Sequence, residues 1–135
     1  MNKHLKIVIF YWIPVLLWMG VIFYLSSQPD LKTPFGIWDT ILRKFAHAFE
    51  FGVLTLLVWR TLAQYQLKLF KLIGWSSVIG LLYAISDEWH QYFVNTRNGN
   101  IWDLLIDCVG IVVIVIIVGS YYRNKEVKQI KKKLS

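Results

Sequence analysis

Ten side chains that could carry out chemistry lie in or beside the apolar stretches of this chain. They combine carboxylates, imidazoles, an amide and two cations: Lys44, His47, Glu50, Asp87, Glu88, His90, Gln91, Arg97, Asp103 and Asp107. Many are spaced by three or four residues, as Asp103 and Asp107 are, which puts them on one face of a helix. A carboxylic acid and an imidazole are common partners in proton transfer, whereas lysine and arginine hold phosphate or carboxylate groups.

These properties give each residue an expected role. Glu88 and His47 are the expected general acid/base pair, because a buried carboxylic acid can hold a proton near neutral pH. Asp107 is the third catalytic candidate and would orient the base. The expected substrate-binding residues hold or orient an anionic group: Lys44, Arg97, Gln91, Asp103, Glu50, Asp87 and His90. No nucleophile is evident, since the apolar neighbours of Cys108 would keep it a thiol.

The composition indicates what kind of chain positions these residues. Of its 135 residues, 56% are hydrophobic and only 17% are charged. This composition excludes a disordered segment, and a soluble domain of this size could not bury so much apolar surface. The single cysteine excludes an intrachain disulfide framework and a multi-cysteine zinc site. The sequence therefore predicts an integral membrane protein.

Four apolar segments predict an all-α bundle of four transmembrane helices. The first has 23 uncharged residues from Ile7 to Pro29, enough to cross a core of roughly 30 Å. A cleaved signal peptide is the alternative, but this run is too long and has no small-residue cleavage site. The other three segments span only if they include their polar residues. We expect the helices near residues 5–25, 39–60, 72–94 and 101–122, with a kink at Pro14 in the first.

Lysine and arginine predict the orientation. With both termini on one side, that side holds 11 of the 15 lysine and arginine residues. The positive-inside rule then puts both termini in the cytoplasm. We expect a membrane domain over residues 1–122 and a basic cytoplasmic tail over 123–135. The tail has no motif that reads bases, so we expect it to contact anionic membrane lipids and not nucleic acid.

In this topology the polar residues of the second, third and fourth helices reach the same depth, in the outer leaflet. Ionisable groups at such a depth are costly unless they face one another or a water-filled cavity, so they indicate a functional site. Gly110, one turn after Asp107, would allow another helix to approach closely. We therefore expect a buried polar site at the outer ends of these helices.

Several residues also have structural interpretations. Asp103 could simply stabilise the start of its helix, and Arg43 and Lys44 could extend to the membrane interface. His90 could be an ordinary interfacial histidine. As a whole, the cluster could instead fix helix packing without any ligand.

Two functional alternatives to catalysis also stay open. The same cluster could bind a lipid or drug headgroup without turning it over. The spacing in His47-x-x-Glu50 and Asp87-x-x-His90 also resembles that of carboxylate metal sites in helical bundles. Because Lys44 and Arg97 disfavour a further cation nearby, we expect no metal and no other cofactor.

The same segments resemble the VanZ-like family of small bacterial membrane proteins. The resemblance rests on ordered motifs: Leu25 to Pro29 (LSSQP), Lys44 to Gly52 (KFAHAFEFG), Asp87 to Phe93 (DEWHQYF), Arg97, and Asp103 to Gly110 (DLLIDCVG). The chain departs from the family pattern at Arg43, where the family usually has an acid, and at Asn95-Thr96, where it often has Pro-Gly.

The resemblance implies a multi-pass protein of the bacterial plasma membrane. The namesake of the family is associated with resistance to teicoplanin, a lipid-bearing glycopeptide that acts outside the membrane. We therefore expect the partners to be membrane lipids and either a lipid-linked envelope substrate or a lipoglycopeptide. The resemblance implies no particular reaction, and the sequence leaves the oligomeric state open.

Overall fold

The computed structural model describes residues 2–28, 36–94 and 101–134, with side chains up to Lys125. Within these ranges the regular structure is entirely helical, which confirms the all-α prediction. The elements are α1 (Lys3–Ile7), η1 (Val8–Trp12), α2 (Ile13–Ser26), α3 (Ile37–Leu62), η2 (Ala63–Tyr65), α4 (Leu69–Gln91) and α5 (Ile101–Leu134). Each predicted helix is present, with ends that differ by a few residues except in α5.

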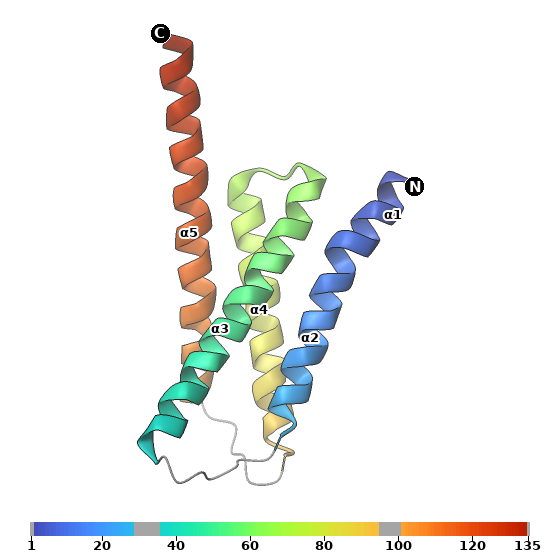
Figure 1. Ribbon diagram of the computed structural model, residues 1–135, viewed down its shortest axis with the longest axis vertical. Helices are drawn as coiled ribbons and strands as arrows, with labels where there is room; N and C mark the ends of the chain where they lie inside the picture. Colours follow the sequence, from blue (N-terminus) through green and yellow to red (C-terminus); the bar gives the residue numbers. More distant parts are fainter. Residues whose placement is uncertain (1, 29–35, 95–100, 135) are drawn as a thin grey trace.

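The predicted kink at Pro14 takes the form of a wider helical turn. Proline lacks the N–H that would bond the carbonyl four residues earlier, which disturbs the preceding turn of the helix. Here the turn over η1 is π-helical, and the N–H of Ile13 bonds the carbonyl of Val8, five residues before it. α1, η1 and α2 nevertheless form one continuous rod (Figure 1).

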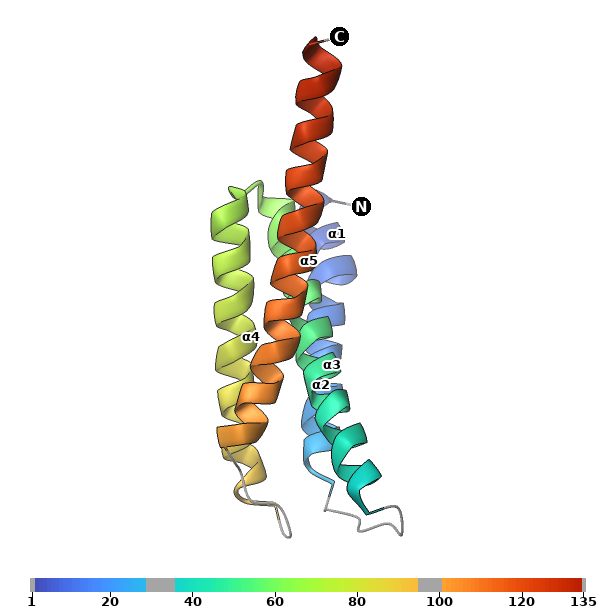
Figure 2. The same cartoon turned by 90° about the vertical axis from the view of Figure 1, so that its left-hand side faces the viewer.

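The helices run up and down in an antiparallel bundle (Figure 1). α1 begins, and α5 ends, at the same end of this bundle. α3 lies against α2, α4 and α5, and α4 also packs on α2 and α5. Figure 2 shows α5 crossing the bundle and continuing beyond the other helices. α5 extends past the predicted end at residue 122 because the basic segment after it contains good helix formers and no glycine or proline.

Three stretches in the described ranges are long and apolar enough to cross a membrane: Lys3–Ser26, Leu69–Gln91 and Ile101–Lys125. α3 is the further helix of the bundle and carries five Asp, Glu, Lys or Arg residues along its 26 positions. Its apolar face is buried at Phe51, Leu54 and Val58. The outward faces of the other helices expose many large apolar side chains, as expected for surfaces in contact with lipid.

Glycines bring α3 and α5 into close contact. A Cβ atom on Gly110 would overlap the carbonyl oxygen of Ala48, and one on Gly52 would lie 3.3 Å from the carbonyl oxygen of Gly110. Small residues in this position let two helix backbones approach each other. The predicted close approach at Gly110 is therefore confirmed, and it fixes how the polar half of α3 faces the first turns of α5.

Candidate functional site

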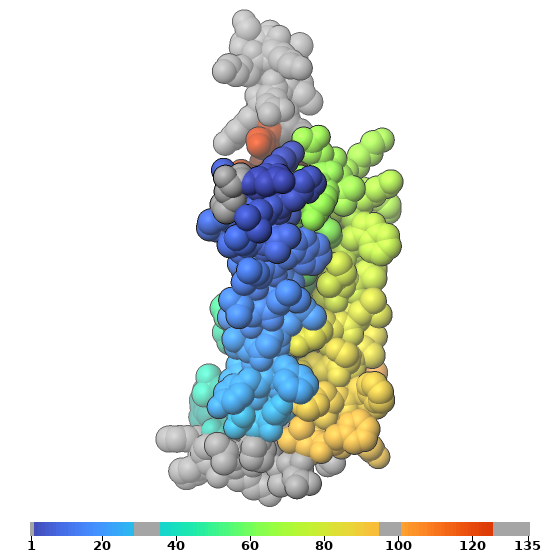
Figure 3. All heavy atoms as spheres, turned by 90° about the vertical axis from the view of Figure 1, so that its right-hand side faces the viewer, coloured from blue at the N-terminus to red at the C-terminus, as the bar shows by residue number. Residues whose placement is uncertain are grey.

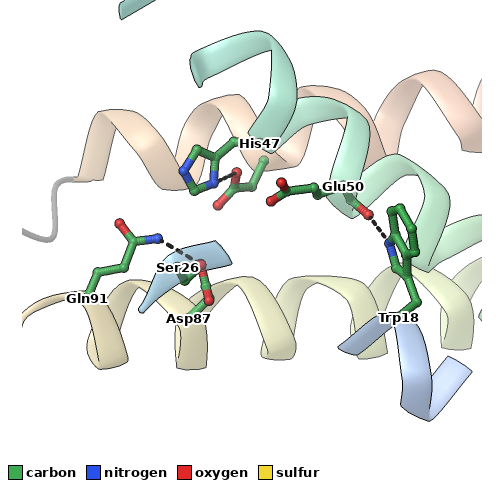
Figure 4. A network of polar contacts seen from close by, with 7 residues as sticks. Trp18, Ser26, His47, Glu50, Asp87 and Gln91 are labelled. Atoms are coloured by element: carbon green, nitrogen blue, oxygen red, sulfur yellow. Dashed lines mark hydrogen bonds and ion pairs between the residues drawn. The ribbon is translucent and has the colours of Figure 1, made fainter. Parts of the chain in front are cut away.

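The buried polar residues gather in the half of the bundle where α2 and α4 end and α5 begins. Among the described residues, six polar side chains from four helices are buried there: Ser26, His47, Glu50, Asp87, Gln91 and Asp107. Figure 4 shows His47 and Glu50 from α3 facing Ser26, Asp87 and Gln91 from α2 and α4. The convergence expected from three helices is thus present, and α2 takes part as a fourth.

Asp87 is the acceptor at the centre of one part of this cluster. The Ser26 hydroxyl and the Gln91 side-chain amide each donate to Oδ2 of Asp87 at 2.8 Å. Asp87 is 3% exposed, so these bonds replace the water that a buried carboxylate would otherwise need. The bond from Ser26 also ties the end of α2 to the last turns of α4.

His47 and Asp107 form the second part. Nδ1 of His47 lies 3.5 Å from Oδ1 of Asp107, and the carboxylate of Asp107 is completely enclosed. Neither oxygen of Asp107 accepts a hydrogen bond from the described residues. The imidazole of His47 therefore faces the buried carboxylate of Asp107.

Further contacts fix the border of the cluster. Nε2 of His90 lies 3.0 Å from the Ser27 hydroxyl, and its ring stacks on Phe23 with centroids 4.3 Å apart. On the other side of the cluster, the indole N–H of Trp18 donates to the main-chain carbonyl of Glu50 at 2.9 Å (Figure 4). Both contacts join α2 to a neighbouring helix.

A cleft of about 280 Å³ opens beside the cluster, between α2 and the first half of α3. Its lining includes Arg43, His47 and Glu50 from α3, and Ser26 and Gln28 from the end of α2. The cleft therefore presents a cation, an imidazole, a carboxylate, a hydroxyl and an amide within one small volume. Such a set can hold a phosphate or carboxylate together with hydroxyl groups.

The structure does not bring every predicted site residue to this cleft. Lys44 is exposed, whereas its neighbour Arg43 lines the cleft. Glu88 and Asp103 are half-buried on α4 and α5 and are not among the lining residues, although Oε1 of Glu88 is shielded from solvent. Arg97 lies outside the described residues.

The described residues contain no set of side chains arranged as the ligands of a metal ion. The spacing of His47 with Glu50 and of Asp87 with His90 suggests such a site. However, no group of three or more His, Cys, Asp or Glu side chains in the described part of the chain is arranged to hold a metal ion. Asp87 is instead bonded to Ser26 and Gln91.

Sequence reasoning did not assign Ser26, Ser27 or Arg43 to the site. Ser26 and Ser27 end a long apolar helix, and they are polar residues at the same depth as the acids. That coincidence of depth is the signal that could have identified them. Arg43 is next to Lys44, and only the packing of α3 against α2 determines which of the two faces the cleft.

Comparison with known proteins agrees with the motifs in α3, α4 and α5. Residues 10–122 match the family model described as VanZ/LLP1. The chain is 32% identical over 117 residues to the uncharacterized membrane protein YwnJ of Bacillus subtilis (strain 168), an alignment that covers 81% of this chain and 74% of that protein. No solved structure matches the chain. The matched region includes every residue that lines the cleft and every buried residue of the polar cluster, and the protein belongs to the VanZ/LLP1 family of membrane proteins.

Proposed function

We propose that the protein binds the anionic, hydroxyl-bearing headgroup of a lipid-linked cell-envelope molecule in the cleft between α2 and α3. The lining of the cleft carries this proposal. Arg43 offers the planar donors that match a phosphate, while Glu50 and Ser26 offer groups for hydroxyls. Apolar Leu25 borders the same cleft, so an attached hydrocarbon chain would leave along the lipid-facing side of α2.

His47 gives the cleft a group that can transfer a proton. Its ring lines the cleft, and Asp107 lies behind it and away from solvent. A carboxylate that holds an imidazole in one orientation favours its use as a base. In this proposal Glu88 is the second proton-transfer group, and Arg97 binds the substrate. Four further polar residues support the site from outside the lining of the cleft: Asp103, Asp87, His90 and Gln91. Lys44, which is exposed, contributes little to binding. A binder without turnover needs the contacts of Arg43 and His47 but tolerates the loss of Glu88.

The proposal includes a position in the membrane. α3 crosses as a fourth span, since it runs antiparallel to α2 and α4 and is long enough at 26 residues. Because most lysines and arginines fall at the end that carries both termini, we assign that end to the cytoplasm. The cleft then lies in the outer leaflet of the bacterial plasma membrane, on the side where envelope precursors are used.

Two adjacent cations provide the test. The purified protein in neutral detergent is titrated with a short-chain polyprenyl phosphate, with phosphatidylcholine as the comparison lipid. Arg43→Gln should weaken polyprenyl phosphate binding by about tenfold or more, because it removes a charge-assisted contact of the cleft. Lys44→Gln, which removes the same charge from an exposed position, should change binding by less than about threefold. Equal losses in both variants, or no preference over phosphatidylcholine, would refute the headgroup site.

The cellular consequence proposed for this activity is tolerance of lipid-bearing glycopeptides. Such drugs and lipid-linked precursors both place a polar group at the outer face of the membrane with an acyl chain below it. A protein that binds or changes molecules of this shape would alter sensitivity to lipoglycopeptides more than to glycopeptides that lack the lipid. This expectation rests on the cleft being in the outer leaflet.

A further inference from the structure

A second polar cleft lies at the opposite end of the bundle, where the chain begins. Its volume is about 320 Å³, and its lining comes from the first turns of the chain and the turn after α3: Lys3, His4, Ile7, Gln64, Tyr65 and Gln66. Figure 3 shows these two segments (dark blue and green) side by side at that end. None of the polar residues of the first cleft takes part in it.

The two walls of this cleft are tied together. The indole N–H of Trp12 donates to the Tyr65 hydroxyl at 3.0 Å, and the Thr61 hydroxyl donates to the carbonyl of Tyr11 at 3.1 Å. The Arg60 guanidinium lies over the Tyr11 ring, 4.8 Å from its centroid. These contacts fix the start of the chain against the end of α3, so the cleft between them is a defined feature of the fold.

The lining of this second cleft suits an anion. Lys3 brings a positive charge, His4 brings a ring N–H, and the side chains of Gln64 and Gln66 bring amide donors. None of the described residues that line it is acidic. The neighbouring cations Lys68, Lys71, Arg123 and Lys125 are exposed, and add to the positive potential around this end of the bundle.

The depth of the cleft indicates where that anion comes from. The apolar stretch Lys3–Ser26 has 24 residues, which reach about 36 Å as a helix, longer than a hydrocarbon core of roughly 30 Å. Lys3 and His4 therefore lie at the level of the lipid headgroups. Tyr65 lines the cleft and accepts a hydrogen bond from Trp12, and such aromatic residues favour the membrane–water boundary.

We propose that this second cleft binds the phosphate of an anionic phospholipid, such as phosphatidylglycerol, in the leaflet next to the termini. Lys3 forms the ion pair with the phosphate, and His4 and the two glutamines donate hydrogen bonds to its oxygens. Ile7 forms the apolar floor toward the acyl chains. This site is separate from the first cleft and does not depend on the function proposed for it.

Native mass spectrometry of the full-length protein in neutral detergent tests the site, because a neutral micelle has no anionic surface of its own. The wild type should retain phosphatidylglycerol in preference to phosphatidylcholine with the same acyl chains. The double variant Lys3→Gln/His4→Gln should weaken that retention by about fivefold or more, the equivalent of ~1 kcal/mol for one lost cation. Both side chains are exposed, so the substitutions leave the core intact.

A matched control separates this site from general surface charge. The variant Lys68→Gln/Lys71→Gln removes at least as much positive charge at the same end, from exposed positions that do not line the cleft. It should change retention by less than about twofold. Equal losses in both double variants, or displacement of the lipid by soluble glycerol phosphate at equal concentration, would overturn the assignment to a phospholipid.

Discussion

Nδ1 of His47 on α3 lies 3.5 Å from Oδ1 of Asp107 on α5, and Asp107 has no solvent-exposed surface. His47 also lines the first cleft, whereas Asp107 does not. A ligand in the cleft can therefore contact the imidazole of His47 but not Asp107, so Asp107 acts on the ligand through its effect on His47. This arrangement makes Asp107 a positioning residue, whose contribution depends on His47 being present.

Ligand binding should reveal this dependence. His47→Asn and Asp107→Asn should each weaken binding of the polyprenyl phosphate probe by about tenfold. The double variant should bind the probe no more weakly than the single variant with the lower affinity. Independent effects would multiply to about a hundredfold and would contradict the pairing. Thermal unfolding of the same samples is the control, since a purely structural role would lower the melting temperature without this pattern in affinity.

Replacing Gly110 by alanine should separate α3 from α5. The new methyl group would overlap the carbonyl oxygen of Ala48, so the two backbones must move apart. We expect a loss of stability of about 2 kcal/mol or more. Gly20→Ala is the matched control, because a methyl group there meets nothing within 4 Å, and it should change stability by less than about 1 kcal/mol. The measurement is thermal unfolding in detergent, and similar melting temperatures for both variants would contradict the close crossing.

The two serines at the end of α2 should differ in their effect on stability. Ser26 is 1% exposed and donates to the buried carboxylate of Asp87, so Ser26→Ala should cost about 1.5–3 kcal/mol. Ser27 is only half-buried and also bonds within its own helix, so Ser27→Ala should cost less than about 1 kcal/mol. Unfolding in detergent compares the two variants directly. A larger loss of stability for Ser27→Ala would show that the hydrogen bond from Ser26 to Asp87 stabilises the fold less than expected.

Glu88→Gln distinguishes catalysis from binding. If Glu88 transfers a proton, this variant should bind the polyprenyl phosphate normally but lose at least about a hundredfold in any turnover detected by lipid analysis. In cells, the wild type should raise tolerance of a lipoglycopeptide more than of a glycopeptide without a lipid, and Glu88→Gln at matched expression should not. Full activity of the variant in both assays would leave Glu88 a structural residue.

Much of the site could be predicted from depth and helical spacing. The antiparallel order of four helices follows from short connections between apolar segments, and it brings Glu50, Asp87 and Asp107 to the same half of the bundle. Gly110 was expected to permit a close helix contact, and the overlap with Ala48 confirms it. These features depend on chain order and on a 3.6-residue period, which the sequence contains.

Other features depend on packing that a single helix pattern does not contain. Arg43 and Lys44 are adjacent, about 100° apart around α3, and only the position of α2 decides that Arg43 lines the cleft. In the sequence, Ser26 is an ordinary polar residue at the end of a helix. Its role follows only from the packing of α2 on α4, which places Asp87 beside it. The length of α5 is also not predicted, because the expected helix ends where the apolar residues end. The basic segment that follows is helical although it is too polar to span a membrane.

If α3 spans the membrane as proposed above, its contacts have a consequence for how the chain is made. His47 and Glu50 of α3 line the same cleft as Ser26, which is translated before α3. His47 also faces Asp107, which is translated some sixty residues after it. An α3 that leaves the insertion machinery alone would expose Glu50 and His47 to lipid, at a cost of several kcal/mol. The helix should therefore remain at the translocon until α5 emerges, so that the bundle enters the bilayer as a late, cooperative event. A ribosome stalled within α4 would hold α3 at the translocon boundary.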